Sequence, residues 1–357
     1  MNLSTAINIT KRSLWLLMVI SLVFSFVACE PKQNEKDEEL SVMMSRDEEF
    51  KIVQFADLHF GKEGEQFHNA DEARTIEFMR YLAETEKPDL IVLSGDNIMN
   101  TGVAGAKELV EIMDSLKTPY AFVFGNHDAE SSLSGYCKRD VSNYLETSDS
   151  PYLLYKAGYV DDGSENRYGN FSISIKDKKT GELLGAVVIV DTGTYDNAKG
   201  RYQSITAGQV EWYRGEITKL NEIYKKQKSN DHDIIPTLTY GHMQLPEHFV
   251  AYKNASEGNG AEFIYEQQLG GWMANAVLGN TGAESSEFFS AMKEMGSARS
   301  YICGHMHGLF YHVNTDGIIL GFCPQIGVSS NRQKTCKTFV YSFDAEFKIN
   351  MRMVEEQ

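Results

Sequence analysis

Between residues 50 and 124, short apolar runs alternate with longer amphipathic segments. The runs "FKIVQF", "LIVLS" and "YAFVF" have the length and the β-branched and aromatic content of buried strands. Segments 71–87 and 105–117 lie between them and repeat apolar residues at helical spacing. Strands separated by helices form βαβ units, in which a mostly parallel sheet is covered on both faces. The alternation therefore predicts an α/β fold.

The later part of the chain predicts a second set of strands. Residues 167–196 read as two alternating strands joined by a Lys-Thr-Gly turn, which is typical of a hairpin. Residues 207–227 form an amphipathic helix for which Thr206 is a suitable cap. Segments 233–243 and 298–308 are two more strands, each ending in Gly-His, and 317–354 alternates like antiparallel strands. This order fits a four-layer αββα sandwich, with two mixed β-sheets flanked by helices.

The N-terminus reads as a targeting segment. Lys11 and Arg12 precede an apolar run that is short for a membrane span, which needs about 20 residues. The run ends in "FVAC", residues 26–29, which resembles the lipobox of bacterial lipoproteins, although Phe26 stands where Leu is usual. The resemblance implies a lipoprotein signal peptide over 1–28 and a lipidated Cys29. The protein would then be exported and anchored to a membrane, facing the periplasm or the cell surface. An ordinary secretory signal is the alternative.

Residues 29–49 are polar, mostly acidic and poor in aromatic residues, so we expect a flexible tether before a domain over 50–357. The formal net charge of -16 disfavours nucleic acid as a partner. Without any CxxC, a zinc ribbon is excluded. The cysteines after residue 29 are expected to be buried thiols, with a Cys323–Cys336 disulfide left open.

Five of the predicted strands end in side chains that can bind a metal. They are Asp57 and His59, then Asp96, then Asn126 and His127, then His242, and finally His305 and His307. In open α/β sheets, ligands bind outside the carboxyl ends of the strands, so these side chains should converge. Imidazole and carboxylate together suit iron, manganese, zinc or nickel. The number of ligands is too large for one ion, and a carboxylate can bridge two ions about 3.5–4 Å apart, which is an arrangement used for displacement at phosphorus.

In this order the motifs "DLH", "GDN", "GNHD", "GHM" and "GHMH" resemble the signature of the calcineurin-like metallophosphoesterase superfamily over residues 50 to 345. The resemblance implies two divalent or mixed-valence transition metal ions (Mn, Fe or Zn). One ion would be held by Asp57, His59 and His307. The other would be held by Asn126, His242 and His305. Asp96 would bridge both.

The resemblance also implies a mechanism. A water activated by both metals would attack phosphorus, and His127 would lie near the leaving-group oxygen with Asp128 orienting it. A finer resemblance, to plant purple-acid-phosphatase-like proteins and a fungal cell-cycle regulator phosphatase, rests on "GNHDAE" and "GHMQLPEH". In the second motif, Gln244 replaces the first Pro of that branch.

We therefore expect a phosphomonoesterase acting on a small phosphoester or a phosphoprotein. A phosphodiesterase for nucleotides or lipid head groups is the alternative enzyme, and a lipid-anchored binding protein with a relic site is the non-enzymatic one. The residues Arg167, Tyr168, Tyr195, Arg201 and Tyr202 lie in loops that either face the metals or make no contact with substrate. His248 is expected to be structural, and His312 is expected at the surface.

Overall fold

The computed structural model describes residues 39–61, 71–99, 101–128, 138–161, 167–196, 198–227, 234–267, 287–328 and 333–357. The predicted signal peptide and Cys29 lie outside these residues. The chain divides into a unit of Met1–Glu39 and a unit of Leu40–Gln357, and the second is described below. Within the described ranges, none of the helices has the length and apolar character needed to cross a membrane.

One sheet contains the first βαβ units and has six strands in the order β18-β17-β2-β4-β6-β7. Its four parallel strands are β2 (Phe50–Phe55), β4 (Leu90–Ser94), β6 (Tyr120–Val123) and β7 (Leu153–Leu154). β17 (Lys337–Phe343) pairs antiparallel with β2, and β18 (Ile349–Glu355) pairs antiparallel with β17. Two short strands, β3 (Phe60–Gly61) and β5 (Ile98–Met99), follow β2 and β4 along the chain and form a separate parallel pair.

The second sheet has eight strands in the order β1-β8-β9-β12-β14-β16-β15-β13. Four of them run parallel: β9 (Leu183–Ile189), β12 (Thr237–Tyr240), β14 (Ala298–Cys303) and β16 (Ile318–Phe322). β8 (Phe171–Asp177) forms the predicted antiparallel hairpin with β9. At the far edge, β15 (His312–Thr315) and β13 (Ala261–Tyr265) pair antiparallel. A separate small hairpin joins β10 (Tyr195–Asp196) to β11 (Arg201–Tyr202).

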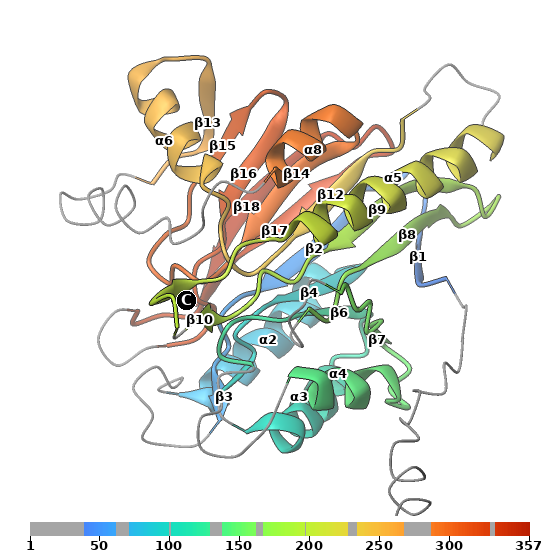
Figure 1. The fold of residues 1–357 in the computed structure, drawn as a ribbon. Helices are drawn as coiled ribbons and strands as arrows, with labels where there is room; N and C mark the ends of the chain where they lie inside the picture. The colour runs from blue at the N-terminus through green and yellow to red at the C-terminus, as the bar shows by residue number, and fades with distance from the viewer. Residues whose placement is uncertain are drawn as a thin grey trace, which may run out of the picture. The chain divides into compact units, whose positions relative to one another are not determined.

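Helices cover the outer faces of both sheets, and Figure 1 shows α2, α3 and α4 on one side with α5 and α8 on the other. The first group is α2 (Glu72–Glu86), α3 (Gly102–Ser115) and α4 (Lys138–Glu146). The second group, against the eight-stranded sheet, is α5 (Ala207–Gln227), α6 (Glu247–Glu257) and α8 (Phe288–Met295). The predicted αββα sandwich is confirmed.

β9 shows why the sequence builds four layers. Every residue of "LLGAVVI" is buried, which a strand covered on only one face would not require. Leu184, Val187 and Ile189 belong to the core between the two sheets. Leu183, Ala186 and Val188 belong to the core under α5 and α8. Successive side chains of a strand point to opposite faces, so one apolar run serves two cores, and an irregularity in the pairing with β8 between Leu183 and Gly185 shifts the alternation once.

The predicted tether over 29–49 is wrong at its C-terminal end. Residues Ser41–Met44 form strand β1, which pairs parallel with β8 along the edge of the eight-stranded sheet. Val42 and Met44 point into the core between the sheets. The burial of Val42 and Met44, two residues apart on one face of the strand, therefore holds this part of the acidic segment in the sheet.

The described cysteines are buried free thiols, as expected. Cys303, Cys323 and Cys336 make no disulfide, so the pairing of Cys323 with Cys336 is not formed. The Cys323 Sγ lies 3.3 Å from the Thr338 Oγ1 instead. Burial raises the pKa of Cys323 to about 12, which keeps the thiol protonated and unreactive.

The prediction that His312 lies at the surface is wrong. His312 is buried, and its Nε2 lies 3.0 Å from the Tyr341 hydroxyl in the other sheet. His248 is also buried, in accord with a structural role. Burial lowers the pKa of each imidazole to about 3.

These two histidines should make the protein sensitive to acid. Below pH 6.5 these two imidazoles bind protons in the unfolded chain but stay neutral in the folded chain. The free energy of unfolding therefore falls as the pH falls. The expected loss at pH 5 is about 2 kcal/mol for each histidine. Urea unfolding at pH 5 and pH 7.5 measures this loss, and His312→Gln should make the decline shallower. A decline of the same size in the variant would contradict the prediction.

Candidate metal centre

The polar residues predicted at the strand ends do converge. β2, β4 and β6 of the six-stranded sheet lead into Asp57 and His59, Asp96, and Asn126 and His127. β12 and β14 of the eight-stranded sheet lead into His242, and into His305 and His307. The site therefore lies where parallel strands of both sheets end, and each sheet supplies part of it.

Backbone hydrogen bonds fix these loops to one another. The N–H groups of Asp57 and His59 donate to the carbonyls of Gly95 and Asp96 at 3.1 and 2.8 Å. Four site residues, Asp57, His59, Asp96 and His305, have positive φ angles between 49° and 65°. Non-glycine residues adopt this left-handed conformation at a cost, and such strain gathers at functional sites. The backbone hydrogen bonds thus hold these turns in a left-handed conformation that non-glycine residues rarely adopt.

One imidazole joins the two sheets directly. The His242 Nδ1 lies 3.0 Å from the carbonyl oxygen of Ser94, at the end of β4. When Nδ1 donates to that carbonyl, Nε2 is left with its lone pair facing the site. Gly95 permits this approach, because a Cβ there would lie 2.4 Å from His242 Nδ1 and the φ angle of Gly95 is +94°.

The first group of donors contains Asp57, His59 and His307. The Nε2 atoms of His59 and His307 lie 3.0 Å apart, and His307 Nε2 lies 3.4 Å from Asp57 Oδ1. The Asp57 carboxylate also accepts hydrogen bonds from the His305 N–H at 3.0 and 3.1 Å. Asp57 and His59 are fully buried.

The second group contains Asp96, His242 and His305. The His242 Nε2 lies 3.1 Å from Asp96 Oδ2 and 3.2 Å from Asn126 Oδ1. A third group places Asp96 with His59 and His127. Asp96 thus lies between the first and second groups, with its Oδ2 3.8 Å from His59 Nε2.

The donor set fits two transition metal ions. Two nitrogens bound to one ion at ~2.1 Å and nearly at right angles lie about 3 Å apart, close to the separation of the two imidazoles of the first group. Each group combines carboxylate oxygen with imidazole nitrogen, which suits manganese, iron or zinc. None of the donors in these groups is a thiolate, unlike the ligands of many structural zinc sites.

The protonation states favour cation binding as well. Burial lowers the pKa of His59 to about 4 and that of His305 to about 3, so both imidazoles are neutral. Burial by itself would raise the pKa of Asp96, but the charge of His242 and its neighbours outweighs burial and holds this pKa well below its ordinary value. Despite burial, Asp96 raises the pKa of His242 to about 9. The carboxylates therefore attract positive charge, which a metal ion supplies as well as a proton does.

His127 and Asp128 do not form the predicted pair. The Asp128 carboxylate accepts hydrogen bonds from the backbone N–H groups of Asn97, Ile98 and Gly125, at 2.9, 2.9 and 2.6 Å. It therefore joins the turn after β4 to the loop after β6, and the prediction that it orients His127 is wrong. The His127 side chain is 20% exposed, and its Nε2 lies 4.0 Å from Asp96 Oδ2.

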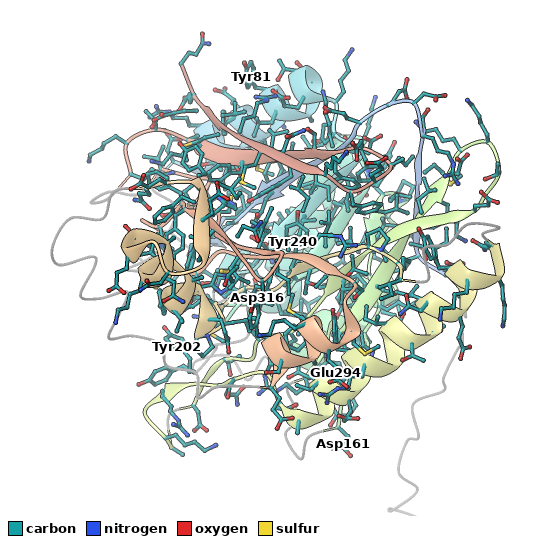
Figure 2. All side chains as sticks on the ribbon, turned by 90° about the horizontal axis from the view of Figure 1, so that it is seen from above. Tyr81, Asp161, Tyr202, Tyr240, Glu294 and Asp316 are labelled. Atoms are coloured by element: carbon teal, nitrogen blue, oxygen red, sulfur yellow. The ribbon has the colours of Figure 1, made fainter. Side chains whose placement is uncertain are left out.

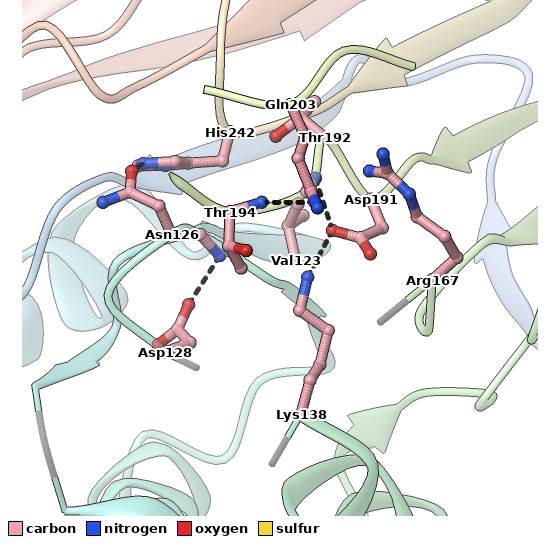
Figure 3. A network of polar contacts seen from close by, with 12 residues as sticks. Val123, Asn126, Asp128, Lys138, Arg167, Asp191, Thr192, Thr194, Gln203 and His242 are labelled. Atoms are coloured by element: carbon pink, nitrogen blue, oxygen red, sulfur yellow. Dashed lines mark hydrogen bonds and ion pairs between the residues drawn. The ribbon is translucent and has the colours of Figure 1, made fainter. Parts of the chain in front are cut away.

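A buried ion pair lies beside the donor groups (Figure 3). Lys138, at the start of α4, donates to Asp191 Oδ1 at 2.7 Å, and both side chains are fully buried. Asp191 follows β9, and its Oδ1 also accepts from the Gly193 N–H at 2.9 Å. The next residue, Thr192, accepts from the N–H of Met243, the neighbour of His242, at 3.1 Å. The pair thus connects α4 to the loop that supports His242.

Breaking this pair should destabilise the protein strongly. Lys138→Met leaves the Asp191 charge buried without its partner, and we expect the free energy of unfolding to fall by about 3–5 kcal/mol. Urea unfolding of the metal-free protein measures the change. Asp191→Asn added to Lys138→Met should restore most of the loss, since it removes the unpaired charge. The exposed pair of Lys179 and Asp47 is the control, and Lys179→Met should change little. An equally small change in the free energy of unfolding of Lys138→Met would contradict the role of the Lys138–Asp191 ion pair in stability.

The sequence contained a signal for one member of this pair. Asp191 follows the apolar run "GAVVIV" in the same way that Asp57 and Asp96 follow theirs, so the rule of polar strand ends applies to it. Lys138 gave no such signal, because a lysine at the start of a helix is ordinarily exposed. Of the five loop candidates, Tyr202 lies against the centre, with its ring 4.8 Å from that of His305.

Comparisons with known proteins agree with the motifs. A family model described as calcineurin-like phosphoesterase matches residues 50–309. "Probable inactive purple acid phosphatase 29" of Arabidopsis thaliana is 29% identical over 284 residues, covering 72% of this chain and 67% of that protein. "Phosphatase DCR2" of Saccharomyces cerevisiae is 28% identical over 250 residues, covering 64% of this chain and 39% of that protein.

Solved structures give distant matches. A dimetal phosphatase from Danio rerio is 11% identical with a TM-score of 0.47, covering 85% of this chain and 98% of that one. A purple acid phosphatase from yellow lupin seeds is 13% identical with a TM-score of 0.46, covering 87% of this chain and 54% of that one.

Proposed function

Because this chain belongs to the calcineurin-like phosphoesterase family, we propose that it is a metal-dependent hydrolase of phosphomonoesters. The observation that carries the proposal is the position of Asp96 between two groups of metal-binding donors. Asp57, His59 and His307 would hold one ion, and Asn126, His242 and His305 the other. A complete donor set is the feature that a catalytic centre needs and a relic site has no reason to keep.

Two cations, when bound, would draw charge from the phosphoryl oxygens and lower the pKa of an attacking water. The protein itself orients the ligands, because the carboxylates of Asp57 and Asp96 each accept a hydrogen bond from a backbone N–H of another loop. Asp57 accepts from the His305 N–H, and Asp96 Oδ1 accepts from the His127 N–H at 2.7 Å. His127, which is partly exposed, would donate a proton to the ester oxygen as its bond to phosphorus breaks. The products are then an alcohol and phosphate.

Metal analysis and a substrate panel test the proposal. Purified protein reconstituted with manganese, iron or zinc should bind two ions per chain and hydrolyse para-nitrophenyl phosphate. Faster hydrolysis of bis-para-nitrophenyl phosphate would instead support a phosphodiesterase. If the reconstituted protein binds metal and hydrolyses neither ester, the non-enzymatic alternative is supported, in line with the word "inactive" in the names of three relatives.

We also propose that the protein is exported and lipid-anchored through Cys29, because "FVAC" and the basic residues before the apolar run resemble a lipoprotein signal peptide. Expression in a bacterium with radiolabelled palmitate should label the wild-type chain and leave Cys29→Ala unlabelled. Release of both proteins in soluble, unlabelled form would support an ordinary secretory signal.

A further inference from the structure

The donor groups can be reached from one side. Asp57, His59, Asp96, Asn126 and His242 are buried. His127, His305 and His307 are half-buried, so they mark the accessible side of the centre. A phosphoester that approaches the donors from this side would bring its leaving group close to these three imidazoles.

Two tyrosines border that side. The Tyr202 ring lies edge-on to His305, with ring centroids 4.8 Å apart and planes at 85°. The Tyr195 ring lies against Tyr202 at 5.1 Å and 82°, and Tyr195 is 39% exposed. The two rings therefore extend from a predicted metal ligand, through the half-buried Tyr202, to the exposed Tyr195.

The backbone beneath these rings is well anchored. Tyr195 and Tyr202 face each other across the antiparallel pair of β10 and β11. Next to them, the Thr194 N–H donates to Gln203 Oε1 at 3.1 Å, and the Gln203 N–H donates to the Thr194 carbonyl at 2.9 Å (Figure 3). The hairpin starts just after Asp191, which the buried Lys138 holds in place. An aromatic surface that is already rigid loses little conformational entropy when it binds a ligand.

From this arrangement we infer that Tyr195 and Tyr202 bind an aromatic ring in the leaving group, so that the preferred substrates are phosphoesters of aromatic or nucleoside alcohols. The inference rests on the proposed function and narrows its substrate class. Planar rings pack on tyrosine by stacking or by edge-to-face contact, whereas an alkyl alcohol of similar size gains only the burial of its area.

Binding of two phosphonates tests the inference without turnover. Phenylphosphonate and cyclohexylphosphonate carry the same phosphoryl oxygens and six-carbon rings of similar size, and only the first ring is aromatic. For manganese-loaded wild-type protein, we expect titration calorimetry to give a Kd for phenylphosphonate about tenfold lower than that for cyclohexylphosphonate. Tyr195→Ala should reduce this ratio several-fold, while Tyr195→Phe should retain it, because the ring and not the hydroxyl makes the contact.

Tyr81 supplies the matched control. It is an exposed tyrosine on α2 that packs on Phe78 at 6.2 Å, and Figure 2 shows it on the opposite side of the view from Tyr202. Tyr81→Ala should leave the ratio at its wild-type value. Metal content is measured for every variant, so that a loss of ions is not mistaken for a loss of stacking.

The outcomes separate the two proposals. A ratio near one in wild-type protein, or a ratio that Tyr195→Ala leaves intact, overturns the inference while the proposed function stands. Failure of both phosphonates to bind, together with no hydrolysis of any ester, overturns both. The two sources of aromatic alcohol are then compared directly through kcat/KM for phosphotyrosine and for a nucleoside 5′-monophosphate, each against glycerol phosphate. Glycerol phosphate as the best substrate of the three would also contradict the inference.

Discussion

Asp96→Asn is expected to reduce kcat/KM for phosphoester hydrolysis by at least about 10³-fold and to reduce bound metal from two ions per chain to one or fewer. Asp96 is the residue that lies between the two donor groups, so its loss weakens both. The neutral amide keeps the shape of the side chain but removes the negative charge that would lie between the two cations. Metal content by mass spectrometry and steady-state kinetics on para-nitrophenyl phosphate measure the two effects.

Asp316→Asn is the control for this change. Asp316 is exposed in the turn between β15 and β16 and has a φ of 53°, close to the 51° of Asp96. Asparagine tolerates this left-handed conformation as aspartate does, so the backbone requirement is the same at both positions. The control variant should retain wild-type activity and two ions. Full metal content and activity in Asp96→Asn would rule out the bridging role.

His127→Ala is expected to lower kcat by about 10²–10⁴-fold while both ions stay bound. The His127 imidazole is partly exposed beside Asp96, and it belongs to neither of the two groups assigned to the ions. If it protonates the leaving oxygen, its loss matters most when that oxygen is strongly basic. The variant should therefore lose far more activity toward glycerol phosphate than toward para-nitrophenyl phosphate, whose leaving group needs little protonation.

The dependence on leaving group distinguishes this role from others. An equal loss for both esters would indicate that His127 stabilises the transition state by charge and not by proton transfer. A loss of one ion in His127→Ala would instead place this residue among the metal ligands, together with His59 and Asp96 as its neighbours. Metal analysis of the same preparation decides between these results.

The positions of the donors were predictable from the sequence for a simple reason. Each follows an apolar run, and parallel strands in a covered sheet place their carboxyl ends at one edge. The order of apolar and polar residues along the chain therefore carries the information. Asp57 and His305, which are in hydrogen-bond contact, could be brought together by this rule across 248 residues.

Features that depend on side-chain partners could not be predicted in this way. The family resemblance implied that Asp128 orients His127. The Asp128 carboxylate instead accepts from the backbone N–H groups of Asn97 and Ile98, 31 and 30 positions earlier, and from that of Gly125. Strand β1 was missed because an edge strand of four residues in an acidic segment gives almost no periodic signal.

The contact of His242 with Ser94 shows that the candidate metal centre lies at the interface between the two sheets. Donors that follow strands of different sheets can meet only when the two sheets are docked. Two cations would therefore find their full set of ligands only in the docked state, and their binding energy would stabilise that state. When metal ions are scarce in the cell, the contact between the six-stranded and the eight-stranded sheet would lose this stabilisation first.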